Sequence, residues 1–261
     1  MSKIPAPIRH LLEPLVRPLR HWRATKRGYA YKFEPTARDT SSPATSGIRP
    51  NALRDFLNSH KEGRVIHKWD HYFEIYDRHF HKFRGQDVRV LEIGVYGGGS
   101  LEMWRDYFGP RAAIYGVDIE PACRAYEREG IKIFIGDQSD RIFWRQFRHE
   151  VSALDIIIDD GGHRAEQQIV SLEELLPILR PNGVYLCEDV HGAFHRFAPY
   201  VLGLDQQLNE HSLRDLKSAC NPFQSMIDSI HLYPFITVIE KRSTNISDFT
   251  SKSWGTEWPS F

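Results

Sequence analysis

The sequence is poor in cysteine, and its few cysteines are not spaced for cross-linking. Cys123, Cys187 and Cys220 are an odd number among 261 residues, and no two of them form a CxxC motif. A disulfide framework and a thiolate zinc site are therefore both disfavoured. The composition favours a reducing compartment, so we expect a cytoplasmic protein.

Long apolar runs and an excess of one charge are also missing. No run of apolar residues approaches the length needed to cross a bilayer. The basic start is interrupted by four prolines and lacks the continuous apolar segment of a secretory signal. The 34 Lys and Arg residues balance 34 Asp and Glu residues, so no overall field attracts nucleic acid. We expect neither a transmembrane segment nor a nucleic-acid partner.

Composition predicts one main domain with two extensions. Residues 1–50 are basic and proline-rich and end in a linker-like stretch. They are expected to be a tail or a helix packed on the domain, with a weak peripheral membrane contact as the alternative reading. Residues 51–242 carry the regular patterning, and residues 243–261 form a polar C-terminal extension.

Helical and strand patterns alternate within the main domain. Helical spacing at 51–60 and 67–83 precedes the alternation, and the second segment carries a stripe of aromatic residues expected to be mostly core. Short apolar runs predict strands at 88–94, 112–119, 131–137, 154–160 and 184–189, with helices at 100–108, 121–129, 140–150 and 163–179. Residues 229–233 and 235–241 predict a closing antiparallel pair. The expected fold is α/β, a Rossmann-like doubly wound sheet of seven strands, mostly parallel, with an antiparallel closing strand.

The turn after the first strand differs from a dinucleotide-binding turn. In "LEIGVYGGGS", Gly94 allows a sharp bend, but Tyr96 occupies the second glycine position of GxGxxG. Glu92 at the strand end would repel a pyrophosphate and suits a cationic ligand better. The second and third strands end in Asp118 and Asp137, which could hold a ribose diol and an adenine edge together with Gln138. Each acid alone could be an ordinary cap, but the set matches S-adenosylmethionine.

Paired carboxylates follow the fourth and fifth strands. Asp159 and Asp160 end one strand, Glu188 and Asp189 end its expected neighbour, and such a cluster would repel itself without a cation. Oxygen ligands favour Mg²⁺ or Mn²⁺ over zinc. One of the two aspartates is expected to cap the next helix or to orient the cofactor instead.

A histidine follows the first of these pairs and is a candidate general base. His163 comes three residues after Asp160, and imidazole exchanges a proton near neutral pH. His191, His195 and His67 compete for the role, and spacing alone does not decide among them.

Several motifs together resemble one enzyme family. "LEIGVYGGGSLEMWRDYF", "YGVDI", "IGDQSD", "IIIDDGGH" and "LRPNGVYLCEDVH" are similar to class I S-adenosylmethionine-dependent methyltransferases, and within these to the metal-dependent macrocin/mycinamicin-type sugar O-methyltransferases. The likeness covers roughly 65–241 and departs from the common pattern at Tyr96. It implies that Asp160, Glu188 and Asp189 bind the metal and that His163 is the base. The residues expected at the cofactor are Lys68, Tyr72, Glu92, Gly94, Tyr96, Ser100, Asp118, Ile119, Asp137, Gln138 and Asp159.

The resemblance implies transfer of a methyl group from S-adenosylmethionine to a sugar hydroxyl, assisted by Mg²⁺. Lys68 and Tyr72 are expected near the methionine end, although Tyr72 could equally be core. The acceptor would be a small molecule or glycan, and self-association into a homo-oligomer is compatible with this reading. Two alternatives stay open, namely methylation of a non-sugar diol such as a catechol or polyketide, and cofactor binding without turnover.

Overall fold

The computed structural model describes residues 22–28, 30–32, 50–192, 195–210, 218–252 and 254–255. The chain divides into two compact units, residues 1–49 and residues 50–261. In the first unit, residues 22–28 are helical, and the Nζ atom of Lys26 lies 5.2 Å from the centre of the Trp22 ring. The rest of the expected basic extension, apart from residues 30–32 and Pro50, lies outside the described residues.

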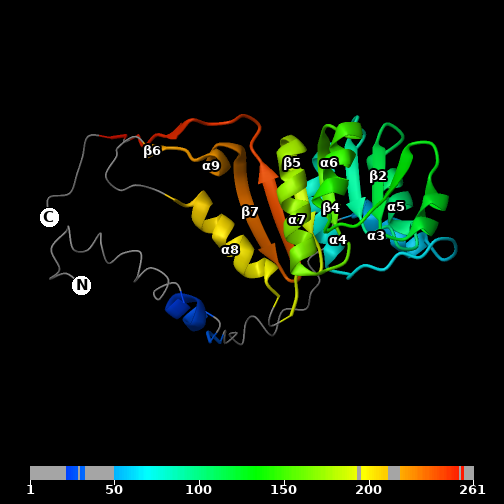
Figure 1. Ribbon diagram of the computed structural model, residues 1–261, viewed down its shortest axis with the longest axis horizontal. Helices are drawn as coiled ribbons and strands as arrows, with labels where there is room; N and C mark the ends of the chain where they lie inside the picture. The colour runs from blue at the N-terminus through cyan, green and yellow to red at the C-terminus, as the bar shows by residue number, and fades with distance from the viewer. Residues whose placement is uncertain are drawn as a thin grey trace. The chain divides into compact units, whose positions relative to one another are not determined.

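The second unit is built on a seven-stranded sheet of order β3-β2-β1-β4-β5-β8-β7 (Figure 1). Strands β1 to β5 are parallel, whereas β8 runs antiparallel to both β5 and β7. This confirms the predicted α/β sheet with an antiparallel closing pair. The strands are β1 (Arg89–Ile93), β2 (Ala113–Asp118), β3 (Ile131–Ile135), β4 (Leu154–Asp159), β5 (Leu179–Cys187), β7 (Ile227–Tyr233) and β8 (Ile236–Lys241).

Helices cover both faces of the sheet, which is why its strands read as continuous apolar runs. Alternate strand residues enter two separate cores; in β1, for example, Val90 belongs to one and Leu91 to the other. The first core includes α3 (Ala52–Ser59), α4 (Tyr72–Phe80), η1 (His81–Phe83) and α5 (Gly99–Phe108). The second includes α6 (Arg141–Glu150), α7 (Ala165–Leu175) and α8 (Phe197–Leu208), with α6 and α7 in front of the sheet in Figure 1.

Two predicted elements differ in the structure. The helix expected at 121–129 is a short 3-10 helix, η2 (Pro121–Tyr126), because Glu127 is extended and Arg128 pairs with Ile131 in a bridge. The helix expected to run to residue 179 stops at Leu175 and is followed by η3 (Leu176–Ile178), which contains a proline. Strand β5 then begins at Leu179, five residues before the predicted start, and its register with β4 shifts near its beginning.

The stretch between β5 and the closing hairpin, unread from the sequence, contributes α8 and α9 (Pro222–Met226). A two-residue strand β6 (Ser218–Ala219) pairs there with β9 (Asp248–Phe249) of the C-terminal extension. The aromatic stripe is core as expected from Tyr72 onward, but Trp69, three residues before the helix begins, is half exposed. None of the helices among the described residues has the length and apolar character needed to cross a membrane.

Candidate active site

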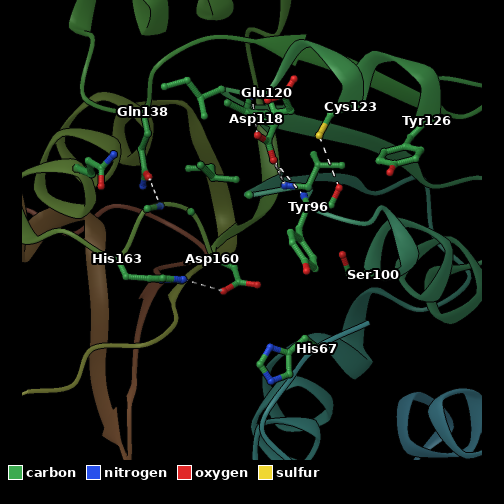
Figure 2. Close-up of a pocket in the computed structure, with 18 of the residues that line it drawn as sticks. His67, Tyr96, Ser100, Asp118, Glu120, Cys123, Tyr126, Gln138, Asp160 and His163 are labelled. Atoms are coloured by element: carbon green, nitrogen blue, oxygen red, sulfur yellow. Dashed lines mark hydrogen bonds and ion pairs between the residues drawn. The ribbon is translucent and has the colours of Figure 1, made fainter. Parts of the chain in front are cut away.

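A cavity of about 640 Å³ opens at the carboxyl ends of the parallel strands. The glycine turn after β1 and the ends of β2 and β3 line one part of it, and the ends of β4 and β5 line the other. Figure 2 shows Tyr96, Asp118 and Glu120 in the first part, and Asp160 and His163 across from them. This is where ligands bind in open α/β sheets.

The glycine turn is held tightly against the end of β4. Gly94 has φ +88°, and a Cβ atom on it would overlap the main-chain carbonyl of Asp160. The amide of Asp160 in turn donates to the carbonyl of Ile93 at 2.9 Å. Only glycine satisfies both the positive φ and the close approach at this point. Tyr96, with φ +47°, is exposed and lines the cavity together with Ser100.

The acids after β2 and β3 accept hydrogen bonds from nearby residues. One oxygen of Asp118 accepts from the amides of Val95 and Tyr96 at 2.8 and 3.0 Å, and the other accepts from the amide of Glu120 at 2.9 Å. Asp137 accepts from the amide and hydroxyl of Ser139, and these bonds lower the pKa of its carboxyl. Asp118, Asp137 and the exposed Ile119 all line the cavity, as expected for the cofactor side.

Asp159, predicted at the cofactor, instead lies behind the cavity wall. It is fully buried and accepts hydrogen bonds from Gln138 Nε2 at 2.6 Å and from the Tyr185 hydroxyl at 2.8 Å. Burial raises the pKa of its carboxyl to about 6. The Oε1 atom of Gln138 accepts from the Gly162 amide at 3.0 Å, so Asp159 shapes the loop after β4 through Gln138. That one of the two aspartates caps the next helix or orients the cofactor stays a prediction.

Lys68 lies among three carboxylates. Its Nζ atom is 2.6 Å from Asp160 Oδ2, 3.1 Å from both oxygens of Glu188 and 3.4 Å from Glu92 Oε1, and only 3% of its side chain is exposed. Burial lowers the pKa of Lys68, but the carboxylates outweigh this effect and raise it well above its usual value. Lys68 therefore supplies a positive charge that the strand ends themselves lack.

Glu92 and Glu188 are thereby held inside the protein. Glu92 accepts from the Ser100 hydroxyl at 2.6 Å and from the Trp104 indole at 3.1 Å, and it does not line the cavity. Glu188 accepts from the Tyr76 hydroxyl at 2.7 Å. Burial, with repulsion from Asp160 as the next cause, raises the pKa of Glu188. Glu92 was predicted at the cofactor; it contacts Ser100, which lines the cavity, but does not line the cavity itself.

Asp160, His163 and Asp189 form a separate, more open cluster, in which one ligand atom from each residue lies within 4.8 Å of the others. The Nε2 atom of His163 is 3.9 Å from Asp160 Oδ1 and 3.7 Å from Asp189 Oδ2. The other oxygen of Asp189 accepts from the Tyr72 hydroxyl at 2.6 Å and the Trp69 indole at 3.1 Å.

The cluster differs from the predicted metal set. Glu188, predicted as a ligand with Asp160 and Asp189, shares the ammonium group of Lys68 with Asp160 and accepts from Tyr76, while His163 lies next to the two aspartates. The metal role of Glu188 stays a prediction. The carboxylates of Asp160 and Asp189 fit one Mg²⁺ or Mn²⁺ ion, whose remaining ligands would be water or substrate oxygens, and the imidazole of His163 next to them would stay free to accept a proton. Tyr72, expected near the methionine end, fixes Asp189.

The four histidines weighed from the sequence have different surroundings. His163, with φ +52°, lies just before α7 and faces both aspartates of the cluster. His195 Nε2 is 2.9 Å from the carbonyl of His163 and supports that turn. His191 Nε2 is 4.0 Å from Asp189, and His191 is not part of the cavity wall. His67 lines the cavity, and Figure 2 shows it on a different segment from His163.

Sequence reasoning missed how residues 68 and 69 act. Lys68 lines the cavity, where it was expected at the cofactor, but its ion pairs with the carboxylate cluster were not foreseen. Trp69 was expected in the core, whereas it is half exposed and donates to Asp189. Both precede α4 by a few residues. The one available signal was a lysine directly before an aromatic stripe in a domain whose strand ends carry only acids.

Known proteins resemble this chain in sequence and in fold. Residues 91–190 match the family described as "Methyltransferase domain". Demethylmacrocin O-methyltransferase of Streptomyces fradiae is 42% identical over 148 residues, which are 53% of this chain and 37% of the relative. An 8-demethyl-8-alpha-L-rhamnosyl tetracenomycin-C 2'-O-methyltransferase of Streptomyces olivaceus is 32% identical over 67% of this chain and 51% of the relative. The chain thus spans roughly a third to a half of the length of these relatives.

A solved structure agrees with the sequence relatives. MycE, a methyltransferase of the mycinamycin biosynthetic pathway solved in complex with Mg, SAH and mycinamycin VI, has a TM-score of 0.62 and 29% identity, covering 74% of this chain and 54% of MycE. The chain therefore contains a methyltransferase domain related to the macrocin-, mycinamicin- and tetracenomycin-type sugar O-methyltransferases.

Proposed function

We propose that this protein transfers a methyl group from S-adenosylmethionine to a hydroxyl of a sugar, with the help of Mg²⁺ or Mn²⁺. One observation carries the proposal: a single cavity is lined at one part by the glycine turn with Asp118 and Asp137, and at the other by Asp160, His163 and Asp189. Its volume of about 640 Å³ is within the usual range of ligand sites. The names of the relatives support a sugar acceptor.

The glycine turn and the ends of β2 and β3 would bind the cofactor, which supplies an electrophilic methyl group when bound. The acids on this wall favour a ligand that carries positive charge and no phosphate. The contacts proposed here are made by Gly94, Tyr96, Ser100, Asp118, Ile119, Asp137 and Gln138. Glu92 and Asp159 act from behind by fixing Ser100 and Gln138.

Asp160 and Asp189 would hold the cation, and Glu188 would support them by keeping Lys68 in place. A bound divalent cation supplies Lewis acidity that lowers the pKa of a coordinated hydroxyl. Tyr72 and Trp69 fix Asp189 from the opposite side, so its carboxylate is oriented before any ligand arrives.

His163 would act as the general base. Its Nε2 atom takes the proton of the acceptor hydroxyl, whose oxygen then bonds to the methyl carbon while the carbon–sulfur electron pair stays on sulfur. Asp160 and Asp189, 3.9 and 3.7 Å away, stabilise the imidazolium that results. The hydrogen bond from His195 to the carbonyl of His163 keeps the turn in place.

The proposal includes the cellular location and the partners of the protein. The three cysteines are free thiols, which supports a cytoplasmic location. The weak membrane contact of residues 1–50 falls mostly outside the described residues and stays a prediction. Self-association into a homo-oligomer also stays a prediction.

The decisive test measures S-adenosylhomocysteine formed from S-adenosylmethionine with a panel of glycosides, in MgCl₂ and in EDTA. His163→Ala should lower turnover by a factor on the order of 10² to 10⁴, as expected for loss of a general base. Asp189→Asn should remove the stimulation by Mg²⁺ while calorimetric binding of S-adenosylhomocysteine stays close to that of the unmodified protein.

The comparison variant is His191→Ala, because His191 is also close to Asp189 but lies outside the cavity wall. At saturating acceptor it should retain most of the turnover, because His191 does not take the proton. A large loss of turnover in His191→Ala, with no loss in His163→Ala, would assign the role of general base to His191. Turnover unaffected by EDTA would exclude the metal role, and cofactor binding without turnover on any glycoside or catechol would favour a non-catalytic protein.

A further inference from the structure

An exposed group of aromatic rings lies next to Asp189 and is not part of the cavity wall. Phe235 is at its centre, with ring centres of Trp69, His71 and His191 at 5.5, 5.8 and 5.3 Å. Trp69 is 51% exposed and Phe235 is 38% exposed, so a substantial part of each residue is open to solvent. We call these four residues the aromatic platform.

The platform is held in place by three segments of the chain. Phe235 is in the turn between β7 and β8 with φ +64°, a conformation that costs free energy in a bulky residue. The carbonyl of Phe235 accepts from the amide of Val190 at 2.9 Å, and the carbonyl of Pro234 is 3.0 Å from His71 Nε2. The positive φ belongs to the two-residue turn that joins β7 and β8, and the two contacts hold the Phe235 ring in place against the neighbouring segments.

The platform is directly connected to the candidate catalytic cluster. The indole of Trp69 donates to Oδ1 of Asp189, while Oδ2 of the same carboxylate faces His163 at 3.7 Å. A molecule lying on the rings of Trp69 and Phe235 would therefore have its edge beside the carboxylate that borders the base. Only the side chain of Asp189 separates Trp69 from His163.

We propose that the aromatic platform is the acceptor subsite and that its occupant is a pyranose ring; this inference rests on the proposed function. The axial C–H groups of a pyranose give it an apolar face with partial positive charge, which matches the negative face of an aromatic ring. Its hydroxyls extend in the ring plane and reach polar groups at the platform's rim, namely Asp189, His71 and His191. Apolar rings ringed by such polar groups suit a sugar better than a wholly apolar partner.

The test uses methyl α-L-rhamnopyranoside as the probe, with S-adenosylhomocysteine and MgCl₂ present. Saturation-transfer NMR should show the sugar C–H protons in contact with the unmodified protein. Trp69→Ala and Phe235→Ala should each weaken binding of the glycoside about tenfold, while calorimetric binding of S-adenosylhomocysteine is unchanged. Leu232→Ala is the matched control, since Leu232 is an exposed apolar residue of the same hairpin.

Trp69→Phe separates stacking from the hydrogen bond to Asp189 and guards against misfolding. It keeps an aromatic face without the indole donor, so it should retain most of the glycoside binding. Loss equal to that of Trp69→Ala would assign the effect to the hydrogen bond and overturn the stacking role. Light scattering completes the test: a dimer that Trp69→Ala converts to a monomer, with glycoside binding unchanged, would make the platform an interface between copies.

The two proposals fail in different ways. Equal glycoside binding in all variants, with turnover in the unmodified protein, overturns the platform and leaves methyl transfer standing. Binding that drops in the variants without any S-adenosylhomocysteine formed from S-adenosylmethionine supports the platform and contradicts the transfer. No binding of the glycoside to the unmodified protein overturns the platform as a sugar site.

Discussion

The two halves of the cavity neutralise their acids in different ways. On the cofactor side, Asp118 and Asp137 accept hydrogen bonds from amides within the same or the adjacent turn. On the metal side, Asp160 and Glu188 share the ammonium group of Lys68, which is 92 and 120 residues away in the chain. Hydrogen bonds from amides hold Asp118 and Asp137 in place and leave their negative charge available to a ligand. The ammonium group of Lys68 instead neutralises part of the charge on Asp160 and Glu188, so the net charge of that cluster changes when a second cation binds.

Among the substitutions considered, removal of the Lys68 ammonium group should change the metal side of the cavity most. Lys68→Met leaves Glu92, Glu188 and Asp160 without their positive partner, and the free energy of unfolding should fall by about 3–5 kcal/mol in EDTA. MgCl₂ should restore part of the loss, because a ligand that binds the folded state stabilises it. Urea denaturation with and without MgCl₂ measures both effects.

The control is Lys132→Met, which removes an exposed ion pair with Glu150 and should cost less than about 1 kcal/mol. Equal losses in the two variants would show that Lys68 is not the counter-ion of the cluster. A loss that MgCl₂ leaves unchanged would indicate that no cation site is created among the freed carboxylates.

A buried carboxyl between the two halves should make stability depend on pH. The folded-state pKa of Asp159 is raised to about 6, above its usual value of 3.8, so the folded protein holds this proton more tightly than the unfolded chain. The favourable contribution is complete below pH 4, falls as the pH rises toward 6 and is then lost. A shift of about two pKa units corresponds to about 3 kcal/mol.

The measurement compares the unmodified protein with Asp159→Asn by urea denaturation between pH 4 and pH 7. The difference in unfolding free energy should move by about 3 kcal/mol in favour of the variant as the pH rises. Effects of other titrating groups cancel between the two proteins. A difference in unfolding free energy that is constant across this pH range would mean that the pKa of Asp159 is not raised in the folded protein.

Glycine substitutions test the contact between the halves. Gly94 and Gly109 both have φ near +90°, but only Gly94 lies against a backbone carbonyl, that of Asp160. Both Ala variants should lose about 1–3 kcal/mol from backbone strain. Gly94→Ala should lose a further ~1–3 kcal/mol from overpacking and should also bind S-adenosylhomocysteine more weakly. Equal losses in thermal denaturation would contradict the contact.

The smallest effect is expected on the cofactor side. Asp118→Asn keeps one acceptor oxygen of the two that bind amides, so about 1 kcal/mol should be lost. Hydrogen exchange at the amides of Val95 and Tyr96 should become faster. Asp140→Asn is the control, because asparagine caps a helix as well as aspartate does. Unchanged exchange at Val95 and Tyr96 would show that Asp118 does not hold the turn.

The fold could be predicted from the sequence because it depends on local patterns. Buried parallel strands give continuous apolar runs, and an acid after a strand can accept from an amide two residues further on, as Asp118 does from Glu120 and Asp137 does from Ser139. Ion pairs between residues far apart in the sequence leave no periodic pattern that a sequence reading could detect. The sequence analysis placed Lys68 at the cofactor but did not foresee that it pairs with the strand-end acids, because Lys68 comes from a segment before the first strand.

Side-chain direction was the second limit of prediction. Glu188 and Asp189 are adjacent, yet the first turns inward to Tyr76 and the second, with φ +54°, turns toward His163. Periodicity also assigned Trp69 to the buried stripe, but the helix begins only at Tyr72, so Trp69 leaves the helical face. Loop geometry that no sequence period encodes decided both outcomes.

The close approach of Gly94 to the carbonyl of Asp160 has a thermodynamic consequence. Because there is no space between them, a movement of the glycine turn, which would bind the nucleoside, requires a movement of the end of β4, which would bind the ion. Occupation of either pocket should then change the affinity of the other by the same factor, since such coupling is reciprocal. A titration of magnesium in the presence and absence of product nucleoside would read that factor directly.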